Sequence, residues 1–187
     1  MTRIVAGTAG GRRLRVPPAG TRPTSDRVRE ALFSFLHARM DFDGLHVLDL
    51  YAGSGALALE ALSRGASHAL LIEADRKAAA IIRGNIGDLG LPGAELRQNS
   101  VGSVLSGAAP ERYDLVFSDP PYDLDVADVQ SDLRSLAENG WLHDEALIVV
   151  ERSTRSPEVV WPDGFEPLKS RTYGETRLDF AEFAGAN

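Results

Sequence analysis

The sequence predicts an α/β protein whose core is a doubly wound, mostly parallel sheet. Three observations lead to this fold class. Short apolar runs alternate with longer amphipathic stretches, which is the pattern of strand–helix–strand units. Two of the apolar runs end in chemically informative residues, a glycine-rich turn after Asp49 and the tetrapeptide Asp119-Pro120-Pro121-Tyr122. The chain has 187 residues, 43% of them hydrophobic, which is enough for one well-buried α/β domain.

Residues 1–40 are predicted to form a small basic extension that precedes the main sheet. Four apolar residues alternate with small and polar ones, as in a hairpin. These are Ile4, Val5, Leu14 and Val16. Thr24 or Ser25 can cap a helix that continues to about Ala38. Its apolar residues fall on one face, at Val28, Ala31, Leu32, Phe35 and Leu36.

Residues 41–187 are predicted to form the main domain, a seven-stranded sheet with an antiparallel last strand. The expected strands are 45–49, 69–73, 94–98, 113–118, 146–151, 168–173 and 176–183, and the expected helices are 56–63, 75–89 and 125–138. The last two strands flank Gly174-Glu175 and form a terminal hairpin. The pattern assigns no element to residues 100–110.

The glycine-rich turn predicts a cofactor site. Glycines at Gly53 and Gly55 let the backbone approach a ligand at the start of the following helix. Glu73 ends the next strand, twenty residues after Gly53, where an acid can accept hydrogen bonds from both hydroxyls of a ribose. NAD and S-adenosylmethionine both fit this half. Asp49, four residues before Gly53, suits the ammonium of S-adenosylmethionine better than a pyrophosphate.

The tetrapeptide from Asp119 to Tyr122 follows the apolar run 113–118 and therefore lies at a strand end. Consecutive prolines fix the backbone and remove two N–H donors, so the local carbonyls stay rigid and unpaired. A carboxylate, a bare carbonyl and an aromatic ring then converge at one strand end. This set can hold a planar base by stacking while it accepts hydrogen bonds from an exocyclic amine. Together with the glycine turn, it predicts methyl transfer.

The net charge of −7 conceals a basic N-terminal segment. Residues 1–30 hold seven arginines against Asp26 and Glu30, a balance of +5, whereas the remaining residues carry 13 basic and 25 acidic groups. An arginine cluster on an acidic body is typical of phosphate-backbone contacts. The alternative is a basic tail without a specific partner.

Other compositional features exclude several classes of function. The chain has no cysteine, which excludes disulfides, thiolate zinc sites and the thiolate adduct used for C5-methylation of pyrimidines. Its four histidines are scattered singly, so we expect no metal site. No apolar run reaches the length of a membrane span and no signal peptide is recognisable, so we expect a cytoplasmic protein.

At these motifs the chain resembles the class I S-adenosylmethionine-dependent methyltransferases, with their Rossmann-like sheet. More narrowly, it is similar to the bacterial 16S rRNA (guanine-N2)-methyltransferase family, RsmD type. The narrower resemblance rests on the stretches Arg3–Gly7, Gly11–Leu14, Pro17, Arg22–Phe33, Asp49–Gly55, Glu73, Asp119–Tyr122 and Tyr173-Gly174. It implies methylation of the exocyclic N2 of one guanine in small-subunit rRNA. It also implies that the substrate is an assembled or assembling small subunit.

The expected site residues fall into three groups. The catalytic residues are Asp119, Pro120 and Tyr122; the cofactor-binding residues are Asp49, Tyr51, Gly53, Ser54, Gly55, Glu73, Ala74, Asn99 and Ser100; the substrate-binding residues are Arg12, Arg13, Arg15, Arg22, Pro121 and Tyr122. Either Asn99 or Ser100 is expected to meet the adenine amino group. We expect a monomer.

Two alternative functions remain open from the sequence. Asp-Pro-Pro-Tyr also occurs in DNA adenine-N6 methyltransferases, and related motifs occur in enzymes that methylate protein glutamine. DNA enzymes usually carry a sizeable recognition domain, for which this chain has no large insertion. The other alternative is a non-catalytic methyltransferase fold that only binds RNA.

Overall fold

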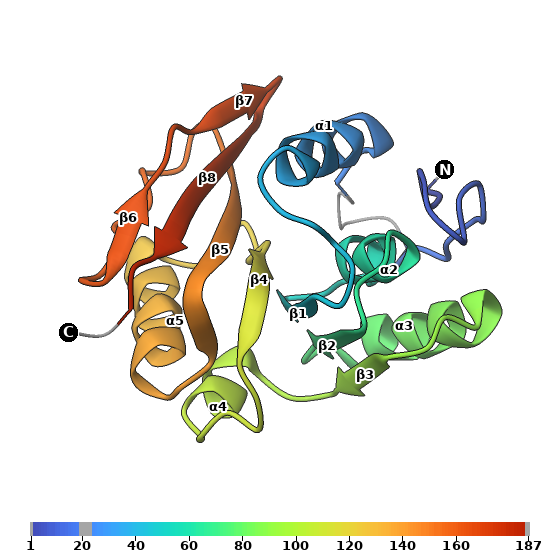
Figure 1. Ribbon diagram of the computed structural model, residues 1–187, viewed down its shortest axis with the longest axis horizontal. Helices are drawn as coiled ribbons and strands as arrows, with labels where there is room; N and C mark the ends of the chain where they lie inside the picture. Colours follow the sequence, from blue (N-terminus) through green and yellow to red (C-terminus); the bar gives the residue numbers. More distant parts are fainter. Residues whose placement is uncertain (1, 19–23, 186–187) are drawn as a thin grey trace.

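The computed structural model describes residues 2–18 and 24–185, and these build one mixed sheet with helices on both faces (Figure 1). The described residues form eight strands in the order β3-β2-β1-β4-β5-β8-β6, and β7 also pairs with β8. The strands are β1 (His46–Leu50), β2 (His68–Ile72), β3 (Ala94–Arg97), β4 (Tyr113–Ser118), β5 (Leu142–Ser153), β6 (Phe165–Pro167), β7 (Arg171–Tyr173) and β8 (Thr176–Phe183). The helices are α1 (Asp26–His37), α2 (Ala56–Ser63), α3 (Arg76–Leu89), α4 (Val101–Leu105) and α5 (Val126–Glu138). The predicted fold class is confirmed.

The parallel part of the sheet is wound in two directions from its centre. From β1 the chain passes outward to β2 and β3, and it then returns to β4 on the other side of β1. Leu50 of β1 pairs with Ser118 of β4, and Ser118 pairs with Val150 of β5. The carboxyl ends of these three strands therefore lie side by side at the point where the winding reverses, which is where open α/β sheets bind ligands.

Two apolar layers cover the sheet. One contains α1, α2, α3 and the N-terminal segment; the other contains α4 and α5. All eight residues of α2 are buried, because the N-terminal segment covers the side of α2 that faces away from the sheet. Among the described residues, no helix is long and apolar enough to cross a membrane.

The N-terminal segment folds back as a loose hairpin. Its β-pairing is limited to one bridge between Arg3 and Arg13, flanked by hydrogen bonds from Ile4 N to Arg12 O at 2.9 Å and from Leu14 N to Thr2 O at 2.9 Å. Ile4 and Leu14 are buried as the alternation predicted. The segment therefore shares its core with α1 and α2.

Three elements differ from the sequence prediction. Residues 101–105 form the short helix α4, which the pattern did not assign. β5 begins at Leu142, four residues earlier than expected. Of the predicted strand 168–173, only residues 171–173 form a strand, β7. Residues 165–167 form the additional strand β6, and between the two strands the Ser170 hydroxyl donates to Asp179 Oδ1 at 2.6 Å. The sheet therefore has one strand more than predicted.

Candidate active site

The carboxyl ends of β1, β2 and β4 enclose a cavity of ≈ 320 Å³. Its wall consists of the glycine turn, the start of α2, the residues after β2, and the tetrapeptide after β4. The lining residues are Pro17, Thr24, Asp49, Tyr51, Ala52, Gly53, Ser54, Ala56, Leu57, Glu73, Asp75, Ala78, Asp119 and Pro121. Both motifs singled out from the sequence thus open into one cavity.

The glycine turn holds the start of α2 against the sheet. Gly55 precedes α2 with a φ of 83°, a left-handed conformation that favours glycine. Asp49 is 2% exposed and accepts a hydrogen bond from Ala58 N at 3.2 Å. Burial raises the pKa of Asp49 well above its ordinary value; the Ala58 bond opposes this, and the nearby Glu73 charge adds to it. A cation in the cavity would offset the cost of this buried charge.

Glu73 is held by two backbone amides. Oε1 accepts from Gly53 N at 2.8 Å, and Oε2 accepts from Asp75 N at 2.8 Å. Each carboxylate oxygen has a further lone pair available, and the side chain borders the cavity. A Cβ at Gly53 would meet no atom within 4 Å, so the backbone there faces open space. This geometry suits a ligand that carries two adjacent hydroxyls.

Tyr51 lines the cavity, but its hydroxyl is bonded elsewhere. Its backbone has a φ of 58°, an uncommon conformation for a non-glycine residue. Its hydroxyl donates to Asp132 Oδ2 of α5 at 2.5 Å. Burial raises the pKa of Asp132 to about 6, although the Tyr51 hydrogen bond lowers it. Because the hydroxyl is engaged with α5, Tyr51 can offer only its ring and backbone to a ligand.

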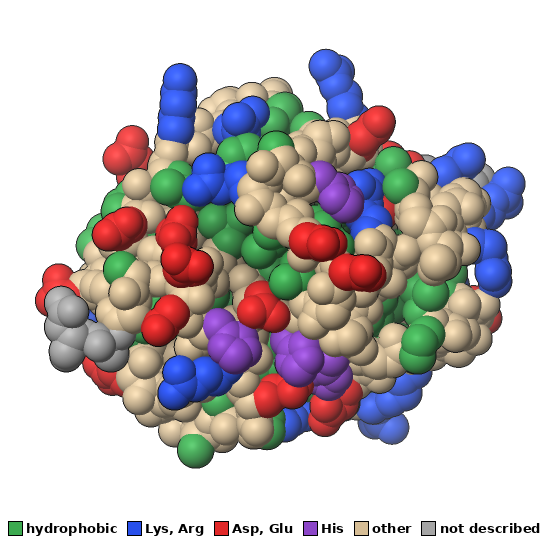
Figure 2. Space-filling model, viewed as in Figure 1, with side chains coloured by type: hydrophobic (Ala, Val, Ile, Leu, Met, Phe, Trp, Pro, Cys, Tyr) green, Lys and Arg blue, Asp and Glu red, His purple; other side chains and the backbone are tan. Residues whose placement is uncertain are grey.

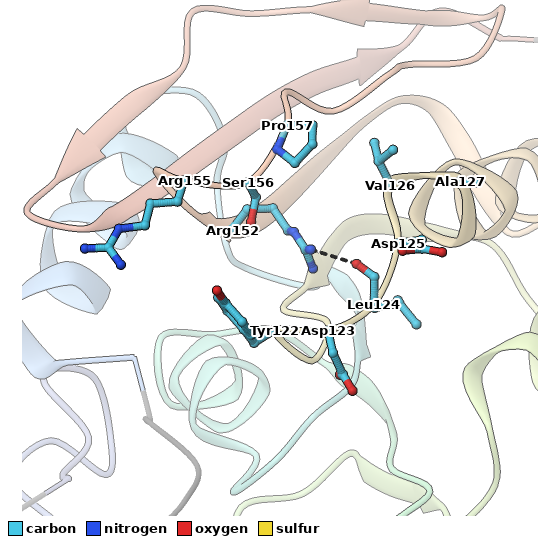
Figure 3. Close-up of a pocket in the computed structure, with 10 residues that line it drawn as sticks. All are labelled: Tyr122, Asp123, Leu124, Asp125, Val126, Ala127, Arg152, Arg155, Ser156 and Pro157. Carbon is cyan, nitrogen blue, oxygen red and sulfur yellow. Dashed lines mark hydrogen bonds between the residues drawn. The ribbon is translucent and has the colours of Figure 1, made fainter.

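Asp119 follows β4 directly and borders the cavity. Burial raises the pKa of Asp119 well above its ordinary value; the charges of Glu151 and Asp49 raise it further, and Arg152 opposes them. Arg152 also fixes the loop, since its guanidinium donates to Leu124 O at 2.8 Å (Figure 3). The same guanidinium donates to Pro121 O at 3.3 Å.

Tyr122 lies at a second cavity, next to the first. This cavity has a volume of ≈ 510 Å³ and is lined by Tyr122, Asp123, Leu124, Asp125, Val126, Ala127, Arg152, Arg155, Ser156 and Pro157 (Figure 3). Tyr122 is 81% exposed, unusual for a large aromatic side chain. Because Pro121 lines the first cavity and Tyr122 the second, the tetrapeptide separates the two. The second cavity carries one aromatic ring, two arginines and two aspartates.

Some predicted site residues lie away from the first cavity. Ala74, Asn99 and Ser100 are exposed and do not line it. Asn99 Oδ1 accepts from Ser100 N at 2.8 Å, and Ser100 caps α4 by accepting from Ser103 N at 3.3 Å. Their role toward an adenine ring stays a prediction. Ser54 lines the cavity, and its carbonyl accepts from Asn85 Nδ2 at 2.9 Å.

The predicted RNA-contacting arginines have different surroundings. Arg15 forms a two-point ion pair with Asp88, with Nε–Oδ2 and Nη2–Oδ1 distances of 3.0 Å and 3.2 Å, and Arg12 Nη2 donates to Asp88 O at 2.7 Å. Arg13 is exposed. Arg22 lies outside the described residues. Figure 2 shows basic side chains gathered at the edge where Figure 1 places the N-terminus.

The sequence analysis missed Thr24, Glu151 and Arg152 as site residues. Thr24 Oγ1 donates to Glu151 Oε2 at 2.7 Å, which joins the start of α1 to the sheet beside Asp119. Glu151 ended a predicted strand, as Asp49 and Glu73 did, and this position was the available signal. Nothing local in the sequence indicates that Arg152 bonds to the loop 121–124.

Comparison with known proteins agrees with this geometry. A family model described as Conserved hypothetical protein 95 matches residues 2–182. The chain belongs to this family. Ribosomal RNA small subunit methyltransferase D of Escherichia coli K12 is 43% identical over 174 residues, which cover 92% of this chain and 85% of that protein. The expected resemblance to the RsmD type is confirmed.

Solved structures extend the likeness to the fold. The structure of the Escherichia coli protein yhhF matches with a TM-score of 0.84 and 35% identity, covering 99% of both chains. Magnesium protoporphyrin IX methyltransferase from Synechocystis, solved with bound SAM, matches with a TM-score of 0.65 at 13% identity; the match covers 84% of this chain and 78% of that one. This second likeness shows the fold alone. The fold is that of the class I methyltransferases.

Proposed function

We propose that this protein transfers a methyl group from S-adenosylmethionine to the exocyclic N2 of a guanine in 16S rRNA of the small ribosomal subunit. One observation carries the proposal. The Asp119–Tyr122 tetrapeptide and the Asp49–Gly55 turn border one cavity in a chain that is 43% identical to a ribosomal RNA small subunit methyltransferase. The cavity can hold the methyl donor, and the exposed tetrapeptide can hold the target nucleobase.

The residues of the cavity fit S-adenosylmethionine better than NAD. Glu73 offers two backbone-fixed oxygens to the ribose hydroxyls, and buried Asp49 provides a negative charge for a cationic ligand. A dinucleotide needs a pyrophosphate beside the glycine turn, where the buried Asp49 would repel it. Bound S-adenosylmethionine supplies an electrophilic methyl group on its sulfonium.

Asp119 orients and activates the target amine. The lone pair of guanine N2 is delocalised into the ring, so the amine is a poor nucleophile. Asp119 and the Pro120 carbonyl accept hydrogen bonds from its two N–H groups, which draws the nitrogen toward a tetrahedral geometry. Methyl transfer requires the nitrogen in line with the bond that breaks, about 3–3.5 Å from the reacting carbon. Asp119 takes the surplus proton once the methyl group has been transferred.

Tyr122 stacks on the extruded guanine. Its ring is exposed at the second cavity, so a base can reach it without rearrangement of the core. Stacking of a base on an aromatic ring contributes roughly 1–3 kcal/mol. Arg152 holds the loop that carries Tyr122, which keeps the ring in place before the base arrives.

Residues 1–40 supply RNA phosphate contacts. The net charge of +5 over residues 1–30 supports this role. Some arginines of this segment are not available to RNA, because Arg29 is fully buried and Arg15 forms an ion pair with Asp88. Exposed arginines such as Arg13 and Arg27 remain for the phosphates. The substrate is the assembled or assembling small subunit, which presents such phosphates in a fixed arrangement.

A methyl-transfer assay tests the proposal. Tritiated S-adenosylmethionine is offered with hypomethylated small subunits, naked 16S rRNA, duplex DNA or protein. Label is expected in the small-subunit rRNA. Label in duplex DNA would support the adenine-N6 alternative instead, and cofactor binding without label in any acceptor would support a non-catalytic binding module.

A further inference from the structure

A second acid lies beside Asp119. Ser118 pairs with Val150 in parallel register, which places Asp119 and Glu151 abreast at the end of β4. Glu151 belongs to β5 and is half-buried. The mechanism above uses Asp119 and leaves Glu151 without a role, although a buried acid beside another acid is costly to maintain.

Thr24 fixes the orientation of Glu151. Its hydroxyl donates to Glu151 Oε2 at 2.7 Å, and Thr24 itself lines the cavity together with Asp119. Glu151 Oε2 therefore lies one hydrogen bond from the cavity wall. Glu151 itself does not line the cavity; it lies behind Thr24 and beside Asp119. Within the described ranges, its other oxygen, Oε1, accepts no hydrogen bond.

The hydrogen-bonding edge of guanine matches two adjacent acceptors. Guanine carries N–H donors at both N1 and N2 along one edge, whereas adenine carries a bare N1 acceptor beside its amine. Asp119 and the Pro120 carbonyl account for the N2 protons. The neighbouring N1–H needs one more acceptor on the same side, and Glu151 is the acid next to Asp119.

We propose that Glu151 accepts a hydrogen bond from N1–H of the target guanine and so selects guanine over bases with a bare N1. The inference rests on the proposed function and names the group that reads the base. A bare N1 would place its lone pair opposite the carboxylate, so that neither of these two acceptors would meet a hydrogen-bond donor. A binding site that forms a hydrogen bond with a particular N–H or O–H group of its substrate discriminates against analogues that lack this group.

The base also relieves the repulsion within the acid pair. Asp119 and Glu151 repel each other when both are charged, and Arg152 is the cation that offsets the charge of Asp119. N–H donors from guanine satisfy both carboxylates at once. Adenine satisfies one of them and adds an acceptor to the other, so the same pair that favours guanine disfavours adenine.

The test compares guanosine with 2-aminopurine riboside at the methylated position of reconstituted small subunits, after the assay above has located that position. 2-Aminopurine keeps the amine on C2 but has a bare N1. The ratio of kcat/KM for the two bases is measured for wild type, Glu151→Gln and Thr24→Val. Glu138→Gln, which removes an exposed acid of α5, is the matched control. Thermal unfolding and cofactor affinity are recorded for each variant.

Wild type and Glu138→Gln are expected to prefer guanosine by about 100-fold. Glu151→Gln is expected to reduce this preference by about tenfold or more, because an amide can donate to a bare N1. Thr24→Val should reduce it less, since the acid loses only its orientation. If wild type is active and both variants keep its ratio, the inference is wrong. If wild type labels no guanosine in small subunits, the proposed function itself fails.

Discussion

Asp119 is the residue on which the chemistry depends. Asp119→Ala removes the acceptor that activates the amine, and we expect turnover to fall by about 10²–10⁴-fold. The unfolding midpoint should not fall, because the variant removes a carboxylate whose pKa burial raises. Single-turnover methylation and calorimetry of cofactor binding measure the two effects. Turnover near the wild-type value would exclude the activating role.

Substitutions of Tyr122 distinguish a stacking role of its ring from a chemical role of its hydroxyl. Because its ring is exposed and stacks on the base, Tyr122→Ala should weaken substrate binding by roughly 1–3 kcal/mol. Tyr122→Phe keeps the ring and should retain most of the activity. Titration of small subunits with each variant gives the affinities. A Phe variant as inactive as the Ala variant would show that the hydroxyl takes part.

The places of the site residues in the fold were predictable where those residues end a strand. Asp49, Glu73 and Asp119 each follow an apolar run, and parallel strands bring such ends to one edge. Asn99 and Ser100 also follow a strand, but the chain after β3 turns at once into α4, which holds Ser100 as a cap. The links from Thr24 and Arg152 to this edge are tertiary contacts, which no local pattern indicates.

At the scale of elements, Glu60 of α2 joins the N-terminal hairpin to the rest of the fold. Its carboxylate is fully buried and accepts from Val5 N at 2.8 Å and Ala6 N at 3.1 Å. It also pairs with the fully buried Arg29 of α1, with an Nε–Oε1 distance of 3.3 Å. Removal of one partner of such a pair leaves an uncompensated buried charge.

We therefore expect Glu60→Gln to lower the free energy of unfolding by about 3 kcal/mol. Urea unfolding measures the loss, and hydrogen exchange should show faster exchange at Val5 and Ala6. Glu30→Gln, at an exposed position of α1, serves as the control and should change little. Equal stability of the two variants would mean that the ion pair does not hold the hairpin.

Helices and strands with strong patterns were predictable, and those defined by their neighbours were not. α2 and β8 have the predicted bounds, because α2 consists of strong helix formers after Gly55 and β8 begins directly after the turn at Gly174-Glu175. β6 precedes the predicted strand 168–173 and is a strand through its antiparallel pairing with the end of β8, which lies outside any local window. α4 is five residues long, too short for a periodic signal.

At the scale of the whole molecule, the acidic side chains at the carboxyl edge of the sheet lower the stability of the folded protein. Burial raises the pKa values of Asp49, Asp119 and Glu151. A carboxyl group whose pKa is higher in the folded state than in the unfolded chain binds more protons when folded. Its contribution to stability is therefore present at low pH and is lost as the pH rises through the raised pKa.

Asp49→Asn should thus stabilise the ligand-free protein at pH values above the ordinary pKa of an aspartate. It should also remove the part of the fall in stability with rising pH that Asp49 causes, while it weakens cofactor binding. Urea unfolding as a function of pH, with calorimetry for the cofactor, measures these effects. Asp163→Asn, at an exposed position, is the control. A variant that is less stable than wild type at pH 8 would contradict this account of the buried acid.

The chemical identity of the methylated nucleoside tests the central claim most directly. Hypomethylated small subunits are incubated with the protein and S-adenosylmethionine, and the 16S rRNA is digested to nucleosides and analysed by mass spectrometry. We expect N2-methylguanosine at one position with wild type and none with Asp119→Ala. N6-methyladenosine, or a methyl group elsewhere on guanine, would contradict it.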